Sequence, residues 1–396
     1  MKLIEVKDKK TAKQFLDVAR IIYKHDKAWV CPLDQDIENI FNPKLNAYYD
    51  DGDAIRWILK DDRGKLIGRV AAFFNKTKAA KFKQPTGGLG FFECIDDREA
   101  ANMLFGKCEE WLSERGMQAM DGPINFGENT DFWGLLVEGF TQPAYGMNYH
   151  RPYYKKLFEN YGFKPFFEQD TRHLDITVPF PDRFWKIAEW VMRKPNLKFE
   201  HFRMAESERF IHDLKTVHDQ AWVFHEHYAP LDINVVRRTL EAAKPILVEE
   251  FIWFVYHEGE PVAFIVMFPD VNQILKHFNG KLNWINKLRF VYLNWRKTIT
   301  RTRITILGVV PRFQGQGIES AIFWHMQEPV LVKRPHLNEI EISWVGDFNL
   351  KMKALFDAIG AKPGKKHITY RKLFSESDSA QYTRTIPLST GKKHGA

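Results

Sequence analysis

The sequence predicts an α/β fold with a mixed sheet, built from two copies of one succession of strands and helices. Three observations carry this prediction. Short apolar runs bounded by turn residues alternate with segments whose apolar residues recur at helical spacing. Turn residues at 61–64 and 258–259 separate paired apolar runs, which indicates a β-hairpin in each half. The segment LFENYGFKP at 157–165 recurs as LFDAIGAKP at 355–363, which indicates an internal repeat.

In the first half, alternating residues predict an edge strand at 2–7. A helix is predicted at 11–23, because Phe15, Val18 and Ile22 fall on one helical face. A hairpin follows at 57–59 and 67–74. Further strands are predicted at 91–95 and 117–125, separated by a helix that ends at Gly116. A helix at 153–161 ends at Gly162.

In the second half, the same order returns. Strands are predicted at 197–204, 250–256, 261–268, 304–310, 339–345 and 367–374, with helices at 210–222, 235–243, 317–329 and from 350 onward. We therefore expect a first α/β domain at 1–173, a linker with several prolines at 174–196, a second α/β domain at 197–374, and a polar tail at 375–396.

The stretch from Ile304 to Glu319 gives the strongest functional signal in the chain. An apolar strand ends at Pro311, and the sequence Gln314-Gly315-Gln316-Gly317 then leads into a helix. Glycines allow a tight turn whose backbone N–H groups point one way, and a helix N-terminus with free N–H groups binds phosphate. The order of strand, glycine turn and helix therefore predicts an anion site.

This turn resembles the pyrophosphate loop of the GNAT (Gcn5-related N-acetyltransferase) superfamily, whose motif is Gln or Arg, two residues, Gly, one residue, then Gly or Ala. Glu319 stands at the last position, where a carboxylate would oppose a phosphate unless it points to solvent. The helix led by Asn349 extends the resemblance, although Phe356 replaces the tyrosine that often protonates the leaving thiolate in this family. The resemblance covers about 197–374 and implies two tandem GNAT-like domains, the first without the coenzyme loop.

The resemblance implies an acyl-coenzyme A dependent N-acyltransferase that uses acetyl-coenzyme A or a longer acyl-coenzyme A. The implied coenzyme contacts are Val309, Val310, Arg312, Gln314, Gly315, Gln316, Gly317, Ile318, Asn349 and Phe356. A backbone N–H of Val309 or Val310 would stabilise the oxyanion. Glu341 is a candidate base. A base that acts through water, and a Glu341 that is an ordinary solvent-facing strand residue, are the alternative interpretations. Ser343, His367 and Tyr370 are candidate proton donors.

The amine acceptor is less well defined. Residues 122–140 are rich in glycine, aromatic and polar residues between a strand and a helix, and such loops often carry sites. Candidate acceptor contacts are Asn125, Glu138, Tyr153, His225 and His227. A buried structural loop and ordinary surface histidines are the alternative interpretations.

Residues 272–303 form a long connection with many apolar and basic residues and no acidic residue. An amphipathic basic helix with tryptophans suits the interface of an anionic membrane or a lid over an acyl chain. Packing against the first copy is the alternative interpretation. The sequence also has a faint similarity to bacterial ceramide synthases. Together with the membrane interpretation, this similarity suggests a lipid or sphingoid-base amine as acceptor.

Composition limits the other function classes. Hydrophobic residues make up 44% of the 396 residues, and the formal net charge is +8, which suits contact with an anion without identifying it. The three cysteines lack metal-ligand spacing, so we expect reduced thiols and no metal site. Neither a secretory signal nor a spanning segment is predicted, which indicates a cytoplasmic protein, at most peripheral to the inner face of a membrane.

Two further functions stay open from the sequence. The net charge of +8 allows an aminoacyl transferase that uses charged transfer RNA on a tandem GNAT fold. The retained glycine turn favours coenzyme over nucleic acid. Phe356 and Glu319 also allow a non-catalytic module that binds acyl-coenzyme A without turnover. The acyl length, the acceptor and the oligomeric state are not specified by the sequence.

Overall fold

The first half of the chain contains the predicted strands and helices in order, and it adds elements that were not predicted, among them those at Asp34–Ile40, Lys76–Ala79 and Leu135–Glu138. A computed structural model describes residues 1–129, 131–222, 230–347 and 349–375. The strands of the first half are β1 (Lys2–Glu5), β2 (Gly52–Lys60), β3 (Leu66–Asn75), β4 (Thr86–Cys94), β5 (Ala119–Gly122), β6 (Leu135–Glu138) and β7 (Lys164–Asp175). Its α-helices are α1 (Lys9–Ile22), α2 (Asp34–Ile40), α3 (Lys76–Ala79), α4 (Arg98–Ser113) and α5 (Tyr154–Tyr161).

The second half repeats this order and adds an insertion before its fourth strand. Its strands are β8 (Leu197–His201), β9 (Ile252–His257), β10 (Glu260–Pro269), β11 (Arg301–Val309), β12 (Glu339–Gly346) and β13 (Lys362–Leu373). Its α-helices are α6 (Asp182–Met192), α7 (Ser207–Trp222), α8 (Ile233–Ala243), α9 (Asn272–Leu275), α10 (Trp284–Trp295), α11 (Ile318–Gln327) and α12 (Leu350–Ala358).

All these strands join one 13-stranded mixed sheet, which confirms the predicted α/β class. The strand order is β1-β2-β3-β4-β5-β13-β7-β12-β11-β10-β9-β8, and β6 pairs with β13 beside this path. Both copies of the repeated segment end a helix near a left-handed glycine, Gly162 (φ 97°) or Gly360 (φ 78°), and then start a long strand. The repeat therefore marks equivalent elements, α5 with β7 and α12 with β13.

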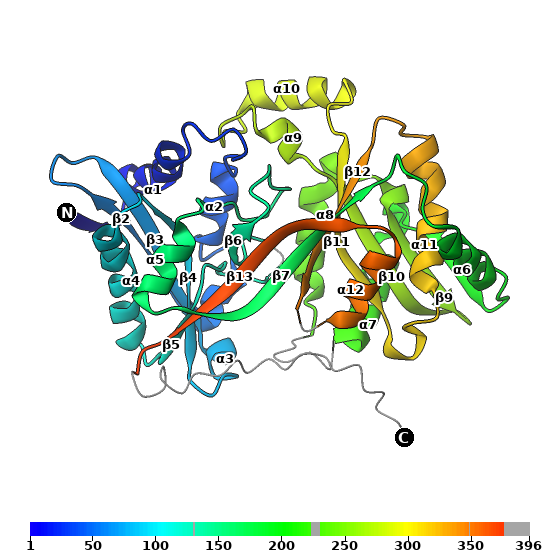
Figure 1. The fold of residues 1–396 in the computed structure, drawn as a ribbon, viewed down its shortest axis with the longest axis horizontal. Coiled ribbons are helices and arrows are strands. Elements are labelled where there is room, and N and C mark those ends of the chain that lie inside the picture. The colour runs from blue at the N-terminus through cyan, green and yellow to red at the C-terminus, as the bar shows by residue number, and fades with distance from the viewer. Residues whose placement is uncertain (130, 223–229, 348, 376–396) are drawn as a thin grey trace.

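The two copies exchange these closing strands. β13 pairs antiparallel with β5 of the first copy, and β7 pairs antiparallel with β12 of the second. Figure 1 shows β7 and β13 crossing the middle of the molecule side by side, with helices covering the sheet on either side. The sheet is therefore continuous between the copies, and a division of the sequence into two segments does not divide it in space.

The segment predicted as a linker contains a packed helix. α6 lies within 174–196, and its residues Phe184, Ala188 and Val191 are buried. Phe184 and Val191 belong to the apolar core of the second half, together with Ile318 and Ile322 of α11. This helix was missed because prolines on both sides of it suggested an extended connection. Its position matters because it covers the helix that follows the glycine turn.

The insertion at 272–303 differs from the single amphipathic helix that the sequence suggested. It forms α9 and α10, joined by a loop that packs on the first half: Ile274 and Phe278 share an apolar cluster with Val30 and Leu33. The carbonyl of Gly280 accepts a hydrogen bond of 2.8 Å from the N–H of Asp34. The inner part of the insertion thus packs against the first copy. No helix within the described ranges is long and apolar enough to cross a bilayer.

Candidate active site

The glycine turn after β11 leaves the first N–H groups of α11 without a side-chain cap. Gly315 and Gly317 have φ angles of 72° and 79°, a left-handed conformation that favours glycine. Gly317 is the N-cap residue of α11 and offers no side chain to these N–H groups. Gln314 and Gln316 brace the turn, since their Nε2 atoms donate to the carbonyls of Val309 and Arg312 at 3.0 and 2.7 Å. The turn can therefore receive an anion such as a pyrophosphate.

The two glycines of the turn differ in their surroundings. A Cβ atom at Gly317 would lie 2.3 Å from Cγ2 of Ile187 in α6, so a side chain there would displace that helix. A Cβ atom at Gly315 would meet no heavy atom within 4 Å. Gly315 is therefore the position at which a side chain can be added to the turn without disturbing the core.

A carboxylate next to a phosphate would be expected to point to solvent. Glu319 does not. Its side chain lies in the first turn of α11 and the residue is only 9% exposed. Burial raises the pKa of its carboxyl group above the usual range, an effect partly offset by a hydrogen bond from its own backbone N–H. The protonated form opposes a phosphate less than the carboxylate does, so binding of a phosphate group at this turn should depend on pH.

Replacing Glu319 with glutamine is expected to strengthen acyl-coenzyme A binding about fivefold or more at high pH. The wild-type carboxyl is neutral below its raised pKa and becomes a carboxylate as pH rises through it, whereas glutamine stays neutral. The ratio of the two dissociation constants, measured by calorimetry across a pH series, should therefore grow with pH. Titration of the phosphates cancels in this ratio.

A separate readout comes from stability. Because the pKa of Glu319 is raised by folding, the folded state holds this proton more tightly than the unfolded state does. Wild type should therefore lose stability as pH rises through this pKa, and the glutamine variant should lose less.

In the binding experiment, a ratio of dissociation constants that stays at one across the pH series would show that Glu319 does not lie at the phosphate site.

β11 and β12 part beyond Ile304 and Ile342. Their parallel pairing runs from Arg301 opposite Glu339 to Ile304 opposite Ile342, whereas β11 stays paired with β10 as far as Val309. The residues of β11 beyond this point, 305–307, are only half-buried. The edge of β11 that faces β12 is thus unpaired from this point to the glycine turn.

This parting decides between the two predicted oxyanion donors. The N–H of Val310 donates to the carbonyl of Val262 at 2.9 Å, so Val310 is not available and the prediction for its N–H is corrected. Successive N–H groups of a strand point to opposite sides. The N–H of Val309 therefore points to the unpaired edge of β11, where it can donate to a bound carbonyl oxygen.

The other predicted coenzyme contacts have structural roles as well. The side chain of Asn349 caps α12 by accepting from the N–H of Met352 at 3.2 Å. Phe356 is buried in the same apolar core as Ile318. Arg312 is exposed, and its guanidinium lies 4.8 Å from the centre of the Phe313 ring. Of these residues, Arg312 is the one whose charge is free to meet an anion at the surface.

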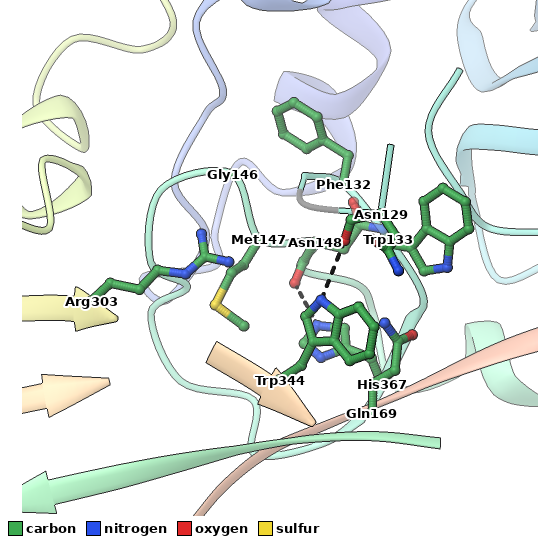
Figure 2. Close-up of a pocket in the computed structure, with 10 residues that line it drawn as sticks. All are labelled: Asn129, Phe132, Trp133, Gly146, Met147, Asn148, Gln169, Arg303, Trp344 and His367. Carbon is green, nitrogen blue, oxygen red and sulfur yellow. Dashed lines mark hydrogen bonds between the residues drawn. The ribbon is translucent and has the colours of Figure 1, made fainter. Parts of the chain in front are cut away.

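A narrow cleft lies beside the point where β11 and β12 part, and both halves of the chain line it (Figure 2). The lining residues are Asn129, Phe132, Trp133, Gly146, Met147, Asn148, Gln169, Arg303, Trp344 and His367. Arg303 lies 3.5 Å from Oγ of Ser343, the first residue of β12 beyond its last pair with β11. The Trp344 indole donates to the carbonyl of Asn129 at 3.2 Å. The cleft therefore adjoins the unpaired edge of β11 through Ser343.

Two buried hydrogen-bond donors at this cleft have no partner within the described part of the chain. They are Nε2 of Gln169, a residue with 0% exposure, and Nε of Arg303, a residue with 6% exposure. Leaving a buried donor unpaired is costly, and such groups are rare in folded proteins. A water molecule or a ligand oxygen atom in the cleft could accept a hydrogen bond from either donor.

His367 faces the same cleft as a neutral imidazole. Its Nε2 lies 3.0 Å from the carbonyl of Asn148, so this nitrogen carries the proton and Nδ1 can accept one. Burial lowers the pKa of His367 to about 4 and that of its neighbour His150 to about 3. At neutral pH the cleft therefore contains an uncharged proton acceptor next to the positive charge of Arg303.

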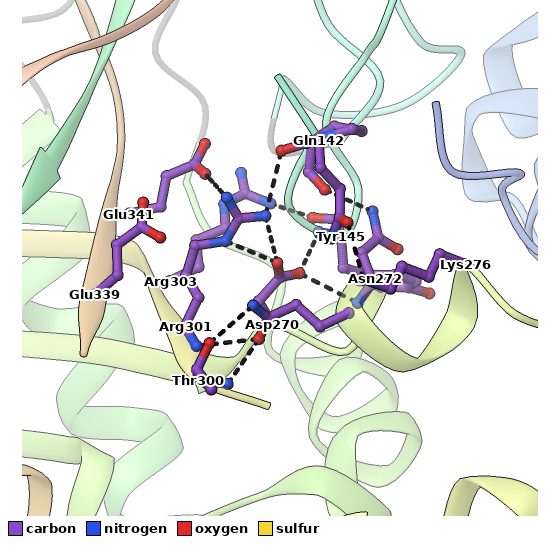
Figure 3. Close-up of polar contacts among 12 residues, drawn as sticks. Gln142, Tyr145, Asp270, Asn272, Lys276, Thr300, Arg301, Arg303, Glu339 and Glu341 are labelled. Atoms are coloured by element: carbon purple, nitrogen blue, oxygen red, sulfur yellow. Dashed lines mark hydrogen bonds and ion pairs between the residues drawn. The ribbon is translucent and has the colours of Figure 1, made fainter. Parts of the chain in front are cut away.

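Four buried charges join the two halves: Asp270, Arg301, Glu341 and Lys365, of which Figure 3 shows the first three. Arg301 donates to Asp270 at 2.6 Å and lies 3.3 Å from Glu341, and Lys365 lies 3.4 Å from the same carboxylate of Glu341. All four residues are at most 6% exposed. Arg301 also donates to the carbonyl of Gln142 in the first half at 3.2 Å. The network balances two acids with two bases at the junction of β10, β11, β12 and β13.

This network corrects the interpretation of Glu341 as a solvent-facing residue. Burial alone would raise the pKa of Glu341, but the charges of Lys365 and Arg301 outweigh burial and lower it. Burial lowers the pKa of Lys365. A carboxylate that is paired twice is a weak proton acceptor, so the structure favours a structural role for Glu341 over the predicted role as base.

The remaining predicted site residues lie away from the cleft. Tyr370 is fully buried in the core of the first half, where its hydroxyl donates to Glu159 at 3.1 Å, so its predicted role as proton donor is corrected. The hydroxyl of Tyr153 donates to the carbonyl of Cys94, and Glu138 pairs with Lys366. Asn125 is buried in the loop after β5. His225 and His227 lie outside the described residues.

Sequence reasoning missed Gln169, Arg303 and Lys365. The alternation of Arg301 and Arg303 with Thr302 and Ile304 was a usable signal, since charges on one face of a buried strand need partners. Lys365 lies in a basic run that resembles a surface turn. Within the described ranges, no group of three or more His, Cys, Asp or Glu side chains is placed to hold a metal ion.

Comparisons with known proteins identify relatives of the chain and its fold. No protein-family model matches the chain. It is 26% identical over 381 residues to Protein YghO of Escherichia coli (strain K12), covering 92% of this chain and 93% of that protein. It is 25% identical over 389 residues to the bacterial ceramide synthase of Caulobacter vibrioides (strain NA1000 / CB15N), covering 94% and 97%.

Solved structures show the fold. A tandem GNAT protein from the clavulanic acid biosynthesis pathway, 11% identical, covers 95% of this chain and 99% of its own with a TM-score of 0.58. A GCN5-related N-acetyltransferase from Sphaerobacter thermophilus, also 11% identical, covers 94% and 96% with a TM-score of 0.51. The chain has a tandem GNAT fold.

Proposed function

We propose that this chain transfers an acyl group from acyl-coenzyme A to the primary amine of a lipid-like acceptor. One observation carries the proposal: the unpaired edge of β11 runs from the uncapped glycine turn at one end to the cleft beside Ser343 at the other. A phosphate-bearing thioester and an amine could thus approach one another along a single strand edge. The Caulobacter vibrioides relative, named as a ceramide synthase, supports a lipid amine as acceptor.

The residues of the chain divide the chemistry as follows. Acyl-coenzyme A supplies the acyl group as an activated thioester. The N–H groups at the start of α11 hold the pyrophosphate, and Arg312 adds a positive charge at the rim. The Val309 N–H donates to the carbonyl oxygen of the thioester as negative charge develops on it during attack by the amine. Water cannot compete at this edge once the acyl chain covers it.

Arg303 and His367 act on the amine. Only the neutral amine is a nucleophile, and a nearby guanidinium lowers the pKa of a bound ammonium group. Nδ1 of His367 can accept a hydrogen bond from the neutral amine, which loses one proton as the new C–N bond forms and the C–S bond breaks. Ser343, in β12 just beyond its last pair with β11, can take up this proton and donate its own hydroxyl proton to the departing thiolate. The unpaired N–H groups of Gln169 and Arg303 hold oxygen atoms of the acceptor.

The test is turnover with a matched set of substrates. Acetyl-, octanoyl- and palmitoyl-coenzyme A are each combined with a long-chain amino alcohol or with spermidine, and release of the coenzyme A thiol is followed. We expect release only with an amine present, and faster with the long-chain amino alcohol. Ser343→Ala should lower kcat by about a hundredfold and leave KM for acyl-coenzyme A unchanged.

Two outcomes would contradict the proposal. Binding of acyl-coenzyme A without release of thiol for any amine would indicate a binding module. Transfer that requires charged transfer RNA, with no release from coenzyme A, would indicate an aminoacyl transferase.

A further inference from the structure

α10 lies on the outside of the molecule and is fixed there by its inner side. Figure 1 shows it as an isolated helix at the edge of the structure, above α9. Phe290 and Leu293 pack against the apolar cluster that contains Val271, Phe278 and Ile299. Asn283 caps the helix by accepting from the N–H of Asn286 at 2.9 Å. The helix is therefore formed and held before it meets any partner.

The outer side of α10 exposes large apolar side chains. The exposed fractions are 71% for Trp284, 63% for Leu288, 66% for Val291 and 74% for Trp295. Ile285 and Tyr292 are exposed as well. At 100° per residue these six side chains fall within an arc of about 120°, opposite to Phe290 and Leu293. We call this set of six residues the outer face of α10. A contiguous exposed apolar surface of this kind marks an interaction site.

Basic residues flank the outer face on both sides. On the same helical wheel Lys287 lies just beyond one border of the arc and Arg289 just beyond the other. Lys281, Arg296 and Lys297 follow at the two ends of the helix and are exposed. No acidic residue occurs from 272 to 303. The partner that covers the outer face must therefore combine an apolar interior with an anionic surface.

We propose that the outer face of α10 inserts into the interface of an anionic lipid bilayer. Tryptophans at both ends of the helix match the depth of lipid headgroups, the aliphatic side chains between them enter the acyl region, and the flanking cations meet anionic headgroups. A second copy of the chain is a poorer occupant, because contact between two such faces would bring like charges together. The proposal does not depend on acyl transfer by the site at β11.

Flotation of the full-length protein with lipid vesicles tests the proposal. Wild type is expected to float with vesicles of phosphatidylglycerol and phosphatidylcholine, and much less with phosphatidylcholine alone or at high salt. A Trp284→Ser/Trp295→Ser variant should lose binding about tenfold or more. The matched control is Trp190→Ser on α6, which removes an indole that is 59% exposed and far from α10 in the sequence. It should float like wild type.

Because the replaced indoles are mostly exposed, the double variant should keep the melting temperature of wild type. It should also keep any turnover of a water-soluble amine, which separates loss of membrane binding from failure of the proposed acyl transfer. Equal flotation of wild type and the double variant would overturn the proposal. The proposal would also be overturned if wild type does not float but forms a dimer that the double variant does not form. The outer face of α10 would then be an interface between copies of the chain.

Discussion

Glu341→Leu is expected to lower the free energy of unfolding by about 3–5 kcal/mol, because it leaves a buried positive charge without its partner. In wild type, Asp270 and Glu341 balance Arg301 and Lys365. Removing Glu341 leaves one acid between two bases, and all three remaining residues are at most 6% exposed. Urea unfolding measures the change.

The double variant Glu341→Leu/Lys365→Met should recover at least about 3 kcal/mol relative to Glu341→Leu. It restores charge balance around the remaining Arg301–Asp270 pair and fills the site with side chains of similar volume. The matched control is the neighbouring surface pair of Glu138 and Lys366. The side chain of Glu138 is 66% exposed. Glu138→Leu should cost no more than about 1 kcal/mol.

Activity of the double variant separates the two interpretations of Glu341. If Glu341 is structural, as its two ion pairs indicate, the refolded double variant should regain most of the acyl transfer that Glu341→Leu loses. A double variant that regains stability but not turnover would restore Glu341 as the base. A cost below about 1 kcal/mol for Glu341→Leu would contradict the buried network itself.

Local patterns predicted the order of elements well because each depends on nearby residues. The glycines that end α5 and α12, the hairpin turns and the apolar strand before the glycine turn act within a few residues of one another. They identified the tandem α/β succession and the turn at Gly315 and Gly317. The helix of the linker, α6, was missed because prolines at its borders were weighted above its apolar spacing.

The exchange of closing strands could not be predicted in the same way. β7 and β13 follow equivalent helices, and each could pair beside the fifth strand of either copy. The choice depends on contacts between residues about 200 positions apart, such as Tyr370 opposite Gly122 and Leu174 opposite Ile340. The same exchange moves Tyr370 into the first core and brings His367 and Lys365 to the junction. These three outcomes follow from one pairing that local sequence does not encode.

The cleft beside Ser343 could not be predicted from the sequence for a related reason. Its side chains come from β7, β11, β12 and β13 and from loops of the first half. Each residue alone has an ordinary context: Gln169 lies in a polar strand, and Trp344 in a mixed one. Only their convergence makes a site. The glycine turn, by contrast, lies within one continuous segment, and a continuous segment is what a motif can describe.

Gly315→Asp is expected to weaken acyl-coenzyme A binding at least about tenfold relative to Gly315→Asn. The two side chains have nearly the same shape, and both tolerate the left-handed conformation that the φ of 72° requires. Both also enter open space, because a Cβ atom there meets nothing within 4 Å. The difference between the variants is therefore one negative charge beside the first N–H groups of α11, and calorimetry measures its effect.

The charge should act only through the phosphates. The effect of the charge on binding should shrink at high salt. The control is Gly64 in the β2–β3 hairpin, which has a φ of 78° and equally open space. Gly64→Asp and Gly64→Asn should bind acyl-coenzyme A with the same affinity. Gly317 would be a poor choice, because a side chain there strikes Ile187 and a loss of binding would then report disrupted packing. Equal affinities of the two Gly315 variants would show that the pyrophosphate lies elsewhere, and the unpaired edge of β11 would then lose its link to a coenzyme.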